Sequence, residues 1–391
     1  MFNITSAIAA ITPRVLAHYE HLHRHPEPSF EEFETTKYII NKLESIGGFK
    51  LTQLTKTGVI ADIDGGKPGK TVALRADIDC LRMDELNKGP LVSENPGLMH
   101  GCGHDAHTAM LLGVAAVISK YKDELPGHYR LLFQPAEETP PGGAIEYVHA
   151  HALDGVDYIL GQHVMPTVPT GQIGLLPGAM MASSDRFKVI IKGSGGHASQ
   201  PHMTIDPIAI GAEIITNLQH IVSRETDPLD QLVVSVTQFH GGSTFNVIPS
   251  EAMLTGSVRS FSEKMRKHAS ERIQEVINAV AHLHRAEVEI TYTYGYDATI
   301  NNPDVAKKLR KVILDRYGEG TIPDLTPLMG AEDFSRYLKV VPGAFYFLGV
   351  GNKAKGYTYP IHHGCFHVDT DALPIGMEVM LRGGIELAGE R

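Results

Sequence analysis

The sequence has few cysteines, no excess of basic residues and no long apolar run. Three cysteines (Cys80, Cys102 and Cys365) among 391 residues cannot make a disulfide framework, so each thiol needs its own explanation. The formal net charge of −10 argues against non-specific nucleic-acid binding, which requires a basic surface. No apolar run reaches the roughly 18 residues of a membrane span, so we expect no membrane partner. The N-terminal segment lacks the features of a secretory signal, and we expect a cytoplasmic protein.

Strand-like and helix-like segments alternate along most of the chain. A length of 391 residues exceeds what one hydrophobic core usually serves, which favours two domains. Apolar runs of strand length end at Asp77, before Glu137 and at His163, and helical patterns cover residues 30–46 and the segment from Asp105. This alternation predicts an α/β domain with a mostly parallel sheet and helices on both faces. In such sheets ligands bind beyond the carboxyl ends of the strands, where the polar residues of this chain gather.

The middle third follows a different order. Two helical patterns interrupt four strand-like segments in the order βαββαβ, which is the ferredoxin-like arrangement. We therefore expect a small domain over residues 184–296, inserted into a discontinuous catalytic domain over residues 1–183 and 297–391.

The stretch MHGCGHDAHTAM, residues 99–110, has an unusual density of metal-capable side chains. Residues 101–106 match the dinucleotide pattern G-x-G-x-x-A, but the preceding GPLVSENPGLMH is not the strand that this pattern requires. A polar turn is a second interpretation, in which His100 and His107 are simply solvated. A metal site is the third interpretation.

Other segments favour the metal site. Glu137 and Glu138, His163 and the pair His362-His363 lie at places that an α/β sheet would bring together. A two-metal hydrolytic site needs several ligands and a bridging group, and a glutamate next to a ligand suits a general base. We therefore expect Glu137 as the base and five metal ligands: Cys102, His104, Glu138, His163 and His362. The alternative is that Cys102 is a catalytic nucleophile, because a cysteine and a histidine together can form such a nucleophile.

Several motifs, in order along nearly the whole chain, resemble one family. The sequence is similar to the aminoacylase and carboxypeptidase-type dinuclear metallohydrolases, in the branch of hippurate hydrolase, N-acyl-L-amino-acid amidohydrolases and auxin-conjugate amidohydrolases. The motifs that carry the resemblance are LHRHPEPSFEE, LRADID, MHGCGHDAHTAM, FQPAEE, GQHVMP, GSGGHASQPH, NVIP, GAEDF and IHHGCFHVD.

The resemblance places the family's functional residues on this chain. It implies the same five ligands, Glu137 as the catalytic glutamate, and two divalent ions per subunit, Zn²⁺ or Mn²⁺ with Ni²⁺ or Co²⁺ as alternatives. It also implies that the inserted domain is a lid and a dimerisation surface, giving a homodimer. Three residues of that domain would hold the substrate: His197, Asn246 and Arg259. A surface salt bridge is the alternative role for Arg259.

The implied activity is hydrolysis of N-acyl amino acids of the N-acetyl or N-benzoyl type by a metal-activated water. A dipeptidase or aminopeptidase on the same metal core, or a catalytically silent ligand-binding homologue, are the alternatives. The chain departs from the family at Pro28, at Cys80-Leu81-Arg82 and at Gly364. The last departure leaves open whether His362 or His363 is the ligand.

Overall fold

The computed structural model describes residues 2–390 and forms two compact units. Unit 1 contains the residues up to Met180, Ile300–Pro327 and the residues from Asp333 onward; unit 2 contains Met181–Thr299 and Leu328–Glu332. Among the described residues, no helix is long and apolar enough to span a membrane. The predicted inserted domain lies within unit 2, and its role as a lid stays a prediction.

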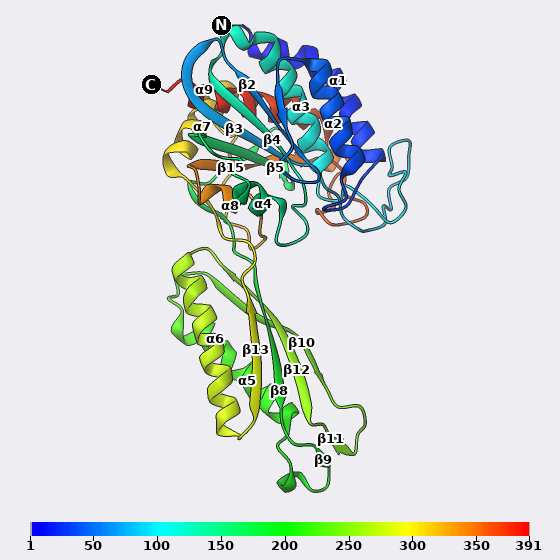
Figure 1. The fold of residues 1–391 in the computed structure, drawn as a ribbon, viewed down its shortest axis with the longest axis vertical. Coiled ribbons are helices and arrows are strands. Elements are labelled where there is room, and N and C mark those ends of the chain that lie inside the picture. Colours follow the sequence, from blue (N-terminus) through cyan, green and yellow to red (C-terminus); the bar gives the residue numbers. More distant parts are fainter. Residues whose placement is uncertain (1, 391) are drawn as a thin grey trace. The chain divides into compact units, whose positions relative to one another are not determined.

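Unit 1 is built on a seven-stranded sheet with the order β1-β2-β4-β3-β5-β15-β6 (Figure 1). The four adjacent strands β4, β3, β5 and β15 run parallel, and β1, β2 and β6 are added by antiparallel pairing. The predicted α/β class and mostly parallel sheet are thus confirmed. The strands are β1 (Lys50–Thr52), β2 (Val59–Asp64), β3 (Lys67–Asp77), β4 (Pro126–Gln134), β5 (Tyr158–Pro169), β6 (Ile173–Gly174) and β15 (Gly343–Gly351).

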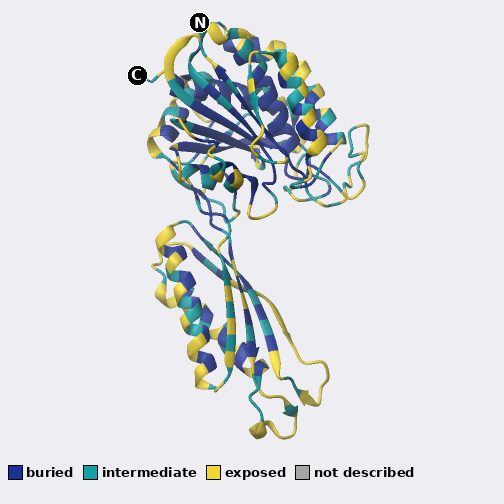
Figure 2. Cartoon of the chain, in the orientation of Figure 1, coloured by how far each residue is buried: buried dark blue, intermediate teal, exposed yellow. Residues whose placement is uncertain are grey.

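Helices pack on both faces of this sheet. Successive residues of a strand point to opposite faces. On β5, the side chain of Leu160 reaches Gly383 of α9, whereas Gly161 lies against Phe334 at the start of α8. The strands between these layers are buried (Figure 2). The helices are α1 (Ile4–Arg24), α2 (Phe33–Ile46), α3 (His104–Tyr121), α4 (Gly143–His149), α7 (Pro303–Tyr317), α8 (Ser335–Leu338) and α9 (Leu373–Ala388).

The helices begin and end where local chemistry dictates. α2 ends at Gly47, whose positive φ of 79° suits glycine and stops the helix as predicted. α3 is apolar around most of its circumference, and its residues from His104 to Ala115 are buried. A helix that is apolar all round belongs in a core. α3 accordingly packs against β3, α1 and α9.

One expectation about β5 is wrong. The sequence places the end of this strand at His163, but the strand continues to Pro169. The reason is its parallel partner β15, which pairs with β5 from Gly343 opposite Ile159 to Gly351 opposite Pro169. His163 therefore lies within a paired, buried strand rather than at its end.

Unit 2 contains a four-stranded antiparallel sheet with the order β10-β12-β8-β13. Along β8, buried and partly or fully exposed side chains alternate, so one face of the sheet is apolar. α5 and α6 pack on that face (Figure 1). A separate two-stranded ladder joins β9 and β11. The elements are β8 (Asp185–Lys192), β9 (Gly196–His197), α5 (Pro207–His220), β10 (Leu232–Gly241), β11 (Val247–Ile248), β12 (Glu251–Ser260), α6 (Glu263–Leu283) and β13 (Glu287–Thr293).

Candidate metal centre

The turn before α3 forms the first part of the site. Gly103 precedes the helix with a left-handed backbone (φ 84°), and a Cβ at this position would lie 2.3 Å from Cγ2 of Val164. Only glycine fits this turn without strain. The turn brings Cys102 against β5, where its Sγ lies 3.2 Å from Nε2 of His163. His104 is the first residue of the helix.

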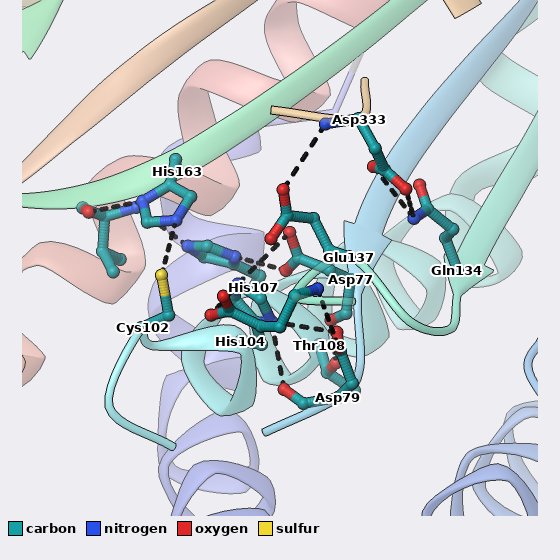
Figure 3. Close-up of polar contacts among 12 residues, drawn as sticks. Asp77, Asp79, Cys102, His104, His107, Thr108, Gln134, Glu137, His163 and Asp333 are labelled. Carbon is teal, nitrogen blue, oxygen red and sulfur yellow. Dashed lines mark hydrogen bonds and ion pairs between the residues drawn. The ribbon is translucent and has the colours of Figure 1, made fainter. Parts of the chain in front are cut away.

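Two groups of metal-capable atoms overlap at Cys102. One group is Cys102, His104 and His163 (Figure 3), and the other is Cys102, Glu138 and His362. Within each group the potential ligand atoms lie within 4.8 Å of one another. The structure thus brings all five predicted ligand residues together in unit 1.

His362, and not its neighbour His363, points into this cluster. Nε2 of His362 lies 3.3 Å from Sγ of Cys102 and 3.4 Å from Oε1 of Glu138. The ring of His363 instead stacks on Tyr359, with the centroids 4.5 Å apart. The geometry therefore favours His362 at the position that the sequence left open.

The donor atoms fit a cation. Nε2 of His104 and Oε1 of Glu138 are buried and have no hydrogen-bond partner among the described residues. Such atoms cost free energy unless something satisfies them. One thiol, three imidazoles and one carboxylate are the ligand types that zinc and similar divalent ions use. The residues at this site therefore suit metal binding, and the two groups that share Cys102 suit two ions.

Asp79 contacts two of the predicted ligand residues, His104 and Glu138. The Nδ1 side of His104 contacts the backbone oxygen of Asp79 at 3.0 Å and its Oδ1 at 3.2 Å, which leaves Nε2 of His104 for the site. Oδ2 of Asp79 accepts hydrogen bonds from Ser29 Oγ and from the backbone N–H of Glu138. A carboxylate that orients a ligating histidine in this way is typical of metal sites.

Asp77 and His107 form a second buried support (Figure 3). Nε2 of His107 accepts a hydrogen bond from the backbone N–H of Val164, so Nδ1 carries the proton and donates to Asp77 Oδ1 at 2.5 Å. Burial opposes the charge on Asp77, but the Arg75 guanidinium and the histidines His104 and His107 outweigh burial and hold its pKa well below the usual range. These residues thus keep a fixed negative charge beside His104.

The supporting roles of Asp77, Asp79 and His107 were not predicted from the sequence. The interpretation of His100 and His107 as solvated is wrong, because both side chains are buried. The motif LRADID carried a signal, since acidic residues at the end of a buried strand need partners. Which histidine each carboxylate would meet depends on contacts between distant segments.

The electrostatics of the centre argue against a nucleophilic cysteine. Burial raises the pKa of Cys102 well above its ordinary value, and the nearby carboxylates of Glu138, Glu137 and Asp77 raise it further. Reactive cysteines need the opposite, a lowered pKa that maintains the thiolate. For His104, burial lowers the pKa, but Asp77, Asp79 and Glu138 outweigh burial and raise it to about 10. A site that stabilises positive charge this strongly favours a cation.

Glu137 lies at the same centre but is held separately. It is buried, and its Oε1 accepts a hydrogen bond from the backbone N–H of Asp333 (3.4 Å). Oxygen atoms of Glu137 and Glu138 and a ring nitrogen of His104 lie within 4.8 Å of one another. Glu137 is thus close enough to act on a molecule bound at the centre while Glu138 contacts His362.

The three predicted substrate-binding residues belong to unit 2. His197 and Val247 are paired across the β9–β11 ladder, and Asn246 accepts a hydrogen bond from Ala198 through its backbone oxygen, so His197 and Asn246 are neighbours. Arg259 lies near the other end of β12, about 25 Å along that strand from its first residue. The structure therefore brings His197 and Asn246 together but keeps Arg259 apart from them within this unit.

Arg259 is half-buried, and its guanidinium donates to the backbone oxygen of Val258 at 3.1 Å. Among residues 2–390 no ion pair with Arg259 is found within 4.0 Å. The alternative of a surface salt bridge therefore has no support in the described structure.

Comparisons with known proteins agree on one family. The sequence profile of peptidase family M20/M25/M40 matches residues 73–383. An N-acyl-L-amino acid amidohydrolase of Geobacillus stearothermophilus is 48% identical over 287 residues, which cover 73% of this chain and 78% of the relative. Thermostable carboxypeptidase 2 of Saccharolobus solfataricus is 40% identical, with 91% of this chain and 90% of that protein covered.

A solved structure gives the same result. A dinuclear metal binding peptidase of the M20 family from Bacillus subtilis superimposes with a TM-score of 0.84 at 34% identity, covering 96% of this chain and 98% of that one. The predicted resemblance to dinuclear metallohydrolases is confirmed, and the chain is a hydrolase that acts on amide bonds. The chain belongs to peptidase family M20/M25/M40.

Proposed function

We propose that the chain is a metal-dependent amidohydrolase that releases the amino acid from N-acyl amino acids. The observation that carries the proposal is the pair of donor groups that share Cys102, with Glu137 beside them. The amidohydrolase relative, which is 48% identical, supports the substrate class.

We assign the five clustered residues as ligands: Cys102, His104, Glu138, His163 and His362. The soft thiol and three imidazoles favour Zn²⁺, while the carboxylate also suits Mn²⁺. Bound divalent ions would supply Lewis-acid chemistry, lowering the pKa of a water molecule and neutralising negative charge that develops on the carbonyl oxygen.

Glu137 is the general base in this proposal. Its carboxylate accepts the proton of the attacking water and then passes it to the nitrogen of the leaving amino acid. The hydrogen bond from the Asp333 N–H to Oε1 fixes one oxygen of Glu137. The carboxyl group of Asp333 accepts hydrogen bonds from Arg75, Gln134 and Ala144, so the N–H that holds Glu137 belongs to a fixed segment.

Unit 2 would supply substrate recognition. We propose that His197 and Asn246 contact the substrate and that Arg259 binds its free carboxylate, since a guanidinium can form two parallel hydrogen bonds with a carboxylate. Unit 2 would also act as a lid and as the contact surface of a homodimer.

Hydrolysis of a substrate panel tests the proposal. Purified protein is loaded separately with Zn²⁺ and Mn²⁺ and incubated with N-acetyl and N-benzoyl amino acids, their carboxyl amides, and dipeptides. We expect turnover of the free N-acyl amino acids, poor turnover of the amides, and loss of all turnover after dialysis against a chelator. Full activity in a sample that elemental analysis shows to be metal-free would refute the proposal.

Peptide hydrolysis is the second candidate. A relative with 40% identity bears the name of a carboxypeptidase, and carboxypeptidases also cleave an amide next to a free carboxylate. Faster turnover of dipeptides or longer peptides than of every N-acyl amino acid would favour this candidate over the first.

A further inference from the structure

Glu32 is a completely buried carboxylate that lies outside the five-ligand cluster. It comes from the motif LHRHPEPSFEE and precedes the first residue of α2. Its side chain does not cap that helix. Instead, Oε1 accepts a hydrogen bond from the backbone N–H of Ala136 and Oε2 accepts one from Thr57 Oγ1, both at 2.7 Å. A buried carboxylate is costly, so this arrangement needs a reason beyond the helix itself.

Ala136 has a backbone conformation that alanine rarely adopts. Its φ of 54° lies in the left-handed region, where a Cβ is unfavourable, so surrounding contacts must hold it. The N–H of Ala136 is bound by Glu32, and its carbonyl oxygen accepts a hydrogen bond from Gly143 N–H at 2.9 Å. Because Glu137 follows directly, the dihedral angles of Ala136 set the direction in which the Glu137 side chain leaves the backbone.

The hydrogen bond from the Ala136 N–H to Glu32 (the Glu32 anchor) is held in place by contacts among three segments: α2, the residues before β2 and the segment at Pro135. The N–H of Gly58, the residue before β2, donates to Thr36 Oγ1 at 2.7 Å, which ties this segment to α2. A Cβ on Gly58 would lie 2.6 Å from Pro135 Cδ, so the segment also packs directly against the residue before Ala136. Glu32 is therefore fixed relative to the segment that it binds.

Glu138 does not depend on this anchor to the same extent. Its own backbone N–H donates to Asp79 Oδ2 at 3.0 Å, and Asp79 also contacts His104. The adjacent glutamates thus have separate supports. Glu32 binds the N–H of the residue before Glu137, whereas Asp79 binds the N–H of Glu138 itself.

We propose that Glu32 is a positioning residue for the general base: it holds Ala136 in the left-handed conformation that aims Glu137 into the centre. This inference rests on the proposed function, in which Glu137 moves the proton. It assigns a role to a residue about 100 positions away in the sequence, whose side-chain hydrogen bonds within residues 2–390 go to Thr57 and Ala136 and not to the ligand cluster.

Three variants separate the acceptor role of Glu32 from general damage. Glu32→Leu removes the acceptor, Glu32→Gln keeps an oxygen that can accept from Ala136, and Thr57→Val removes only the other partner. For Glu32→Leu we expect kcat to fall about 10- to 100-fold, as for other residues that orient an active-site group. KM and metal content should stay close to the wild-type values, because Glu32 acts on the backbone of Ala136. Glu32→Gln and Thr57→Val should retain most of the wild-type kcat.

Hydrogen exchange gives a readout that needs no substrate. The amide of Ala136, followed by mass spectrometry of a peptide that spans residues 133–143, should exchange faster in Glu32→Leu than in wild type, Glu32→Gln or Thr57→Val. Circular dichroism and urea unfolding identify any variant that fails to fold. If Glu32→Leu fails to fold, a loss of kcat or faster exchange of the Ala136 amide in folded Glu32→Gln overturns the proposal, and wild-type behaviour of Glu32→Gln supports it.

Each outcome bears on the proposal. Slower turnover with retained metal, faster exchange and recovery in Glu32→Gln support it. Unchanged kcat in folded Glu32→Leu, loss of metal in parallel with activity, or equal damage from Leu and Gln overturns it. If wild-type protein cleaves no amide, the proposed function fails, while the exchange data still decide whether Glu32 holds Ala136.

Discussion

Substitution of Gly103 tests whether the turn before α3 is as tightly determined as the structure indicates. Gly103 has a φ of 84°, and an added Cβ would lie 2.3 Å from Cγ2 of Val164. Gly103→Ala therefore has two separate costs. The left-handed conformation costs an L-residue about 1–2 kcal/mol. Forcing a methyl group into a filled site costs a further 1–3 kcal/mol or so. We expect Gly103→Ala to lower the free energy of unfolding by about 2–5 kcal/mol.

Gly155 provides the matched control. Its φ is 75°, close to that of Gly103, but no atom lies within 4 Å of the position of an added Cβ. Gly155→Ala should therefore show the conformational cost alone, about 1–2 kcal/mol. Any gain from a stiffer unfolded chain is common to both variants and cancels in the comparison.

Urea unfolding followed by circular dichroism, with a chelator present, measures both costs. The chelator matters because metal that binds only the folded state would add its own stabilisation. Combining Gly103→Ala with Val164→Ala removes the clashing Cγ2, so the penalty of Gly103→Ala in that background should fall to the Gly155 level. If Gly103→Ala costs no more than Gly155→Ala, or if Val164→Ala does not reduce the cost of Gly103→Ala, the contact with Val164 does not determine the penalty.

Two further predictions concern the glutamates and a buried histidine. Glu137→Gln should keep its metal but lose several orders of magnitude in kcat, because both proton transfers would fail, whereas Glu138→Gln should lower metal content by elemental analysis; the opposite pattern would reverse the roles. For His23, burial lowers the pKa, but hydrogen bonds to Asp105 and Glu85 outweigh burial and raise the pKa to about 10. The stabilising contribution of these contacts is therefore complete below about pH 6.5 and is lost as the pH rises toward 10. Urea unfolding should accordingly show wild type and His23→Gln converging in stability between these pH values, and a constant difference would contradict the assignment.

Local sequence patterns predicted much of the fold. The α/β class, the helix that ends at Gly47 and the helix after Gly103 follow from periodicity and glycine placement, which act over a few residues. The end of β5 was misplaced because the strand extends as far as its partner β15 pairs with it. No local pattern around His163 contains that information.

In the candidate site, too, the sequence predicted one part and missed another. The five proposed ligand residues were predicted because thiol, imidazole and carboxylate groups recur at the expected strand ends and in a glycine-flanked turn. The supports were not identified, because each joins segments that are distant in the sequence. Examples are Asp77 with His107, Asp333 with Glu137 and Glu32 with Ala136. The positive φ of Ala136 is likewise set by these tertiary contacts.

The parallel pairing of β5 with β15 has a consequence for biosynthesis. β5 ends at Pro169 and β15 begins at Gly343, so the ribosome must make all of unit 2 before β5 can gain this neighbour. At about 5–20 residues per second, this interval lasts on the order of ten seconds or more. During that time a nascent chain has a central, apolar strand with an open edge, which is a site for aggregation. His362 emerges later still, so four of the five proposed ligand residues are synthesised well before the centre can close. A chain stalled on the ribosome within unit 2 would therefore carry an incomplete candidate metal site.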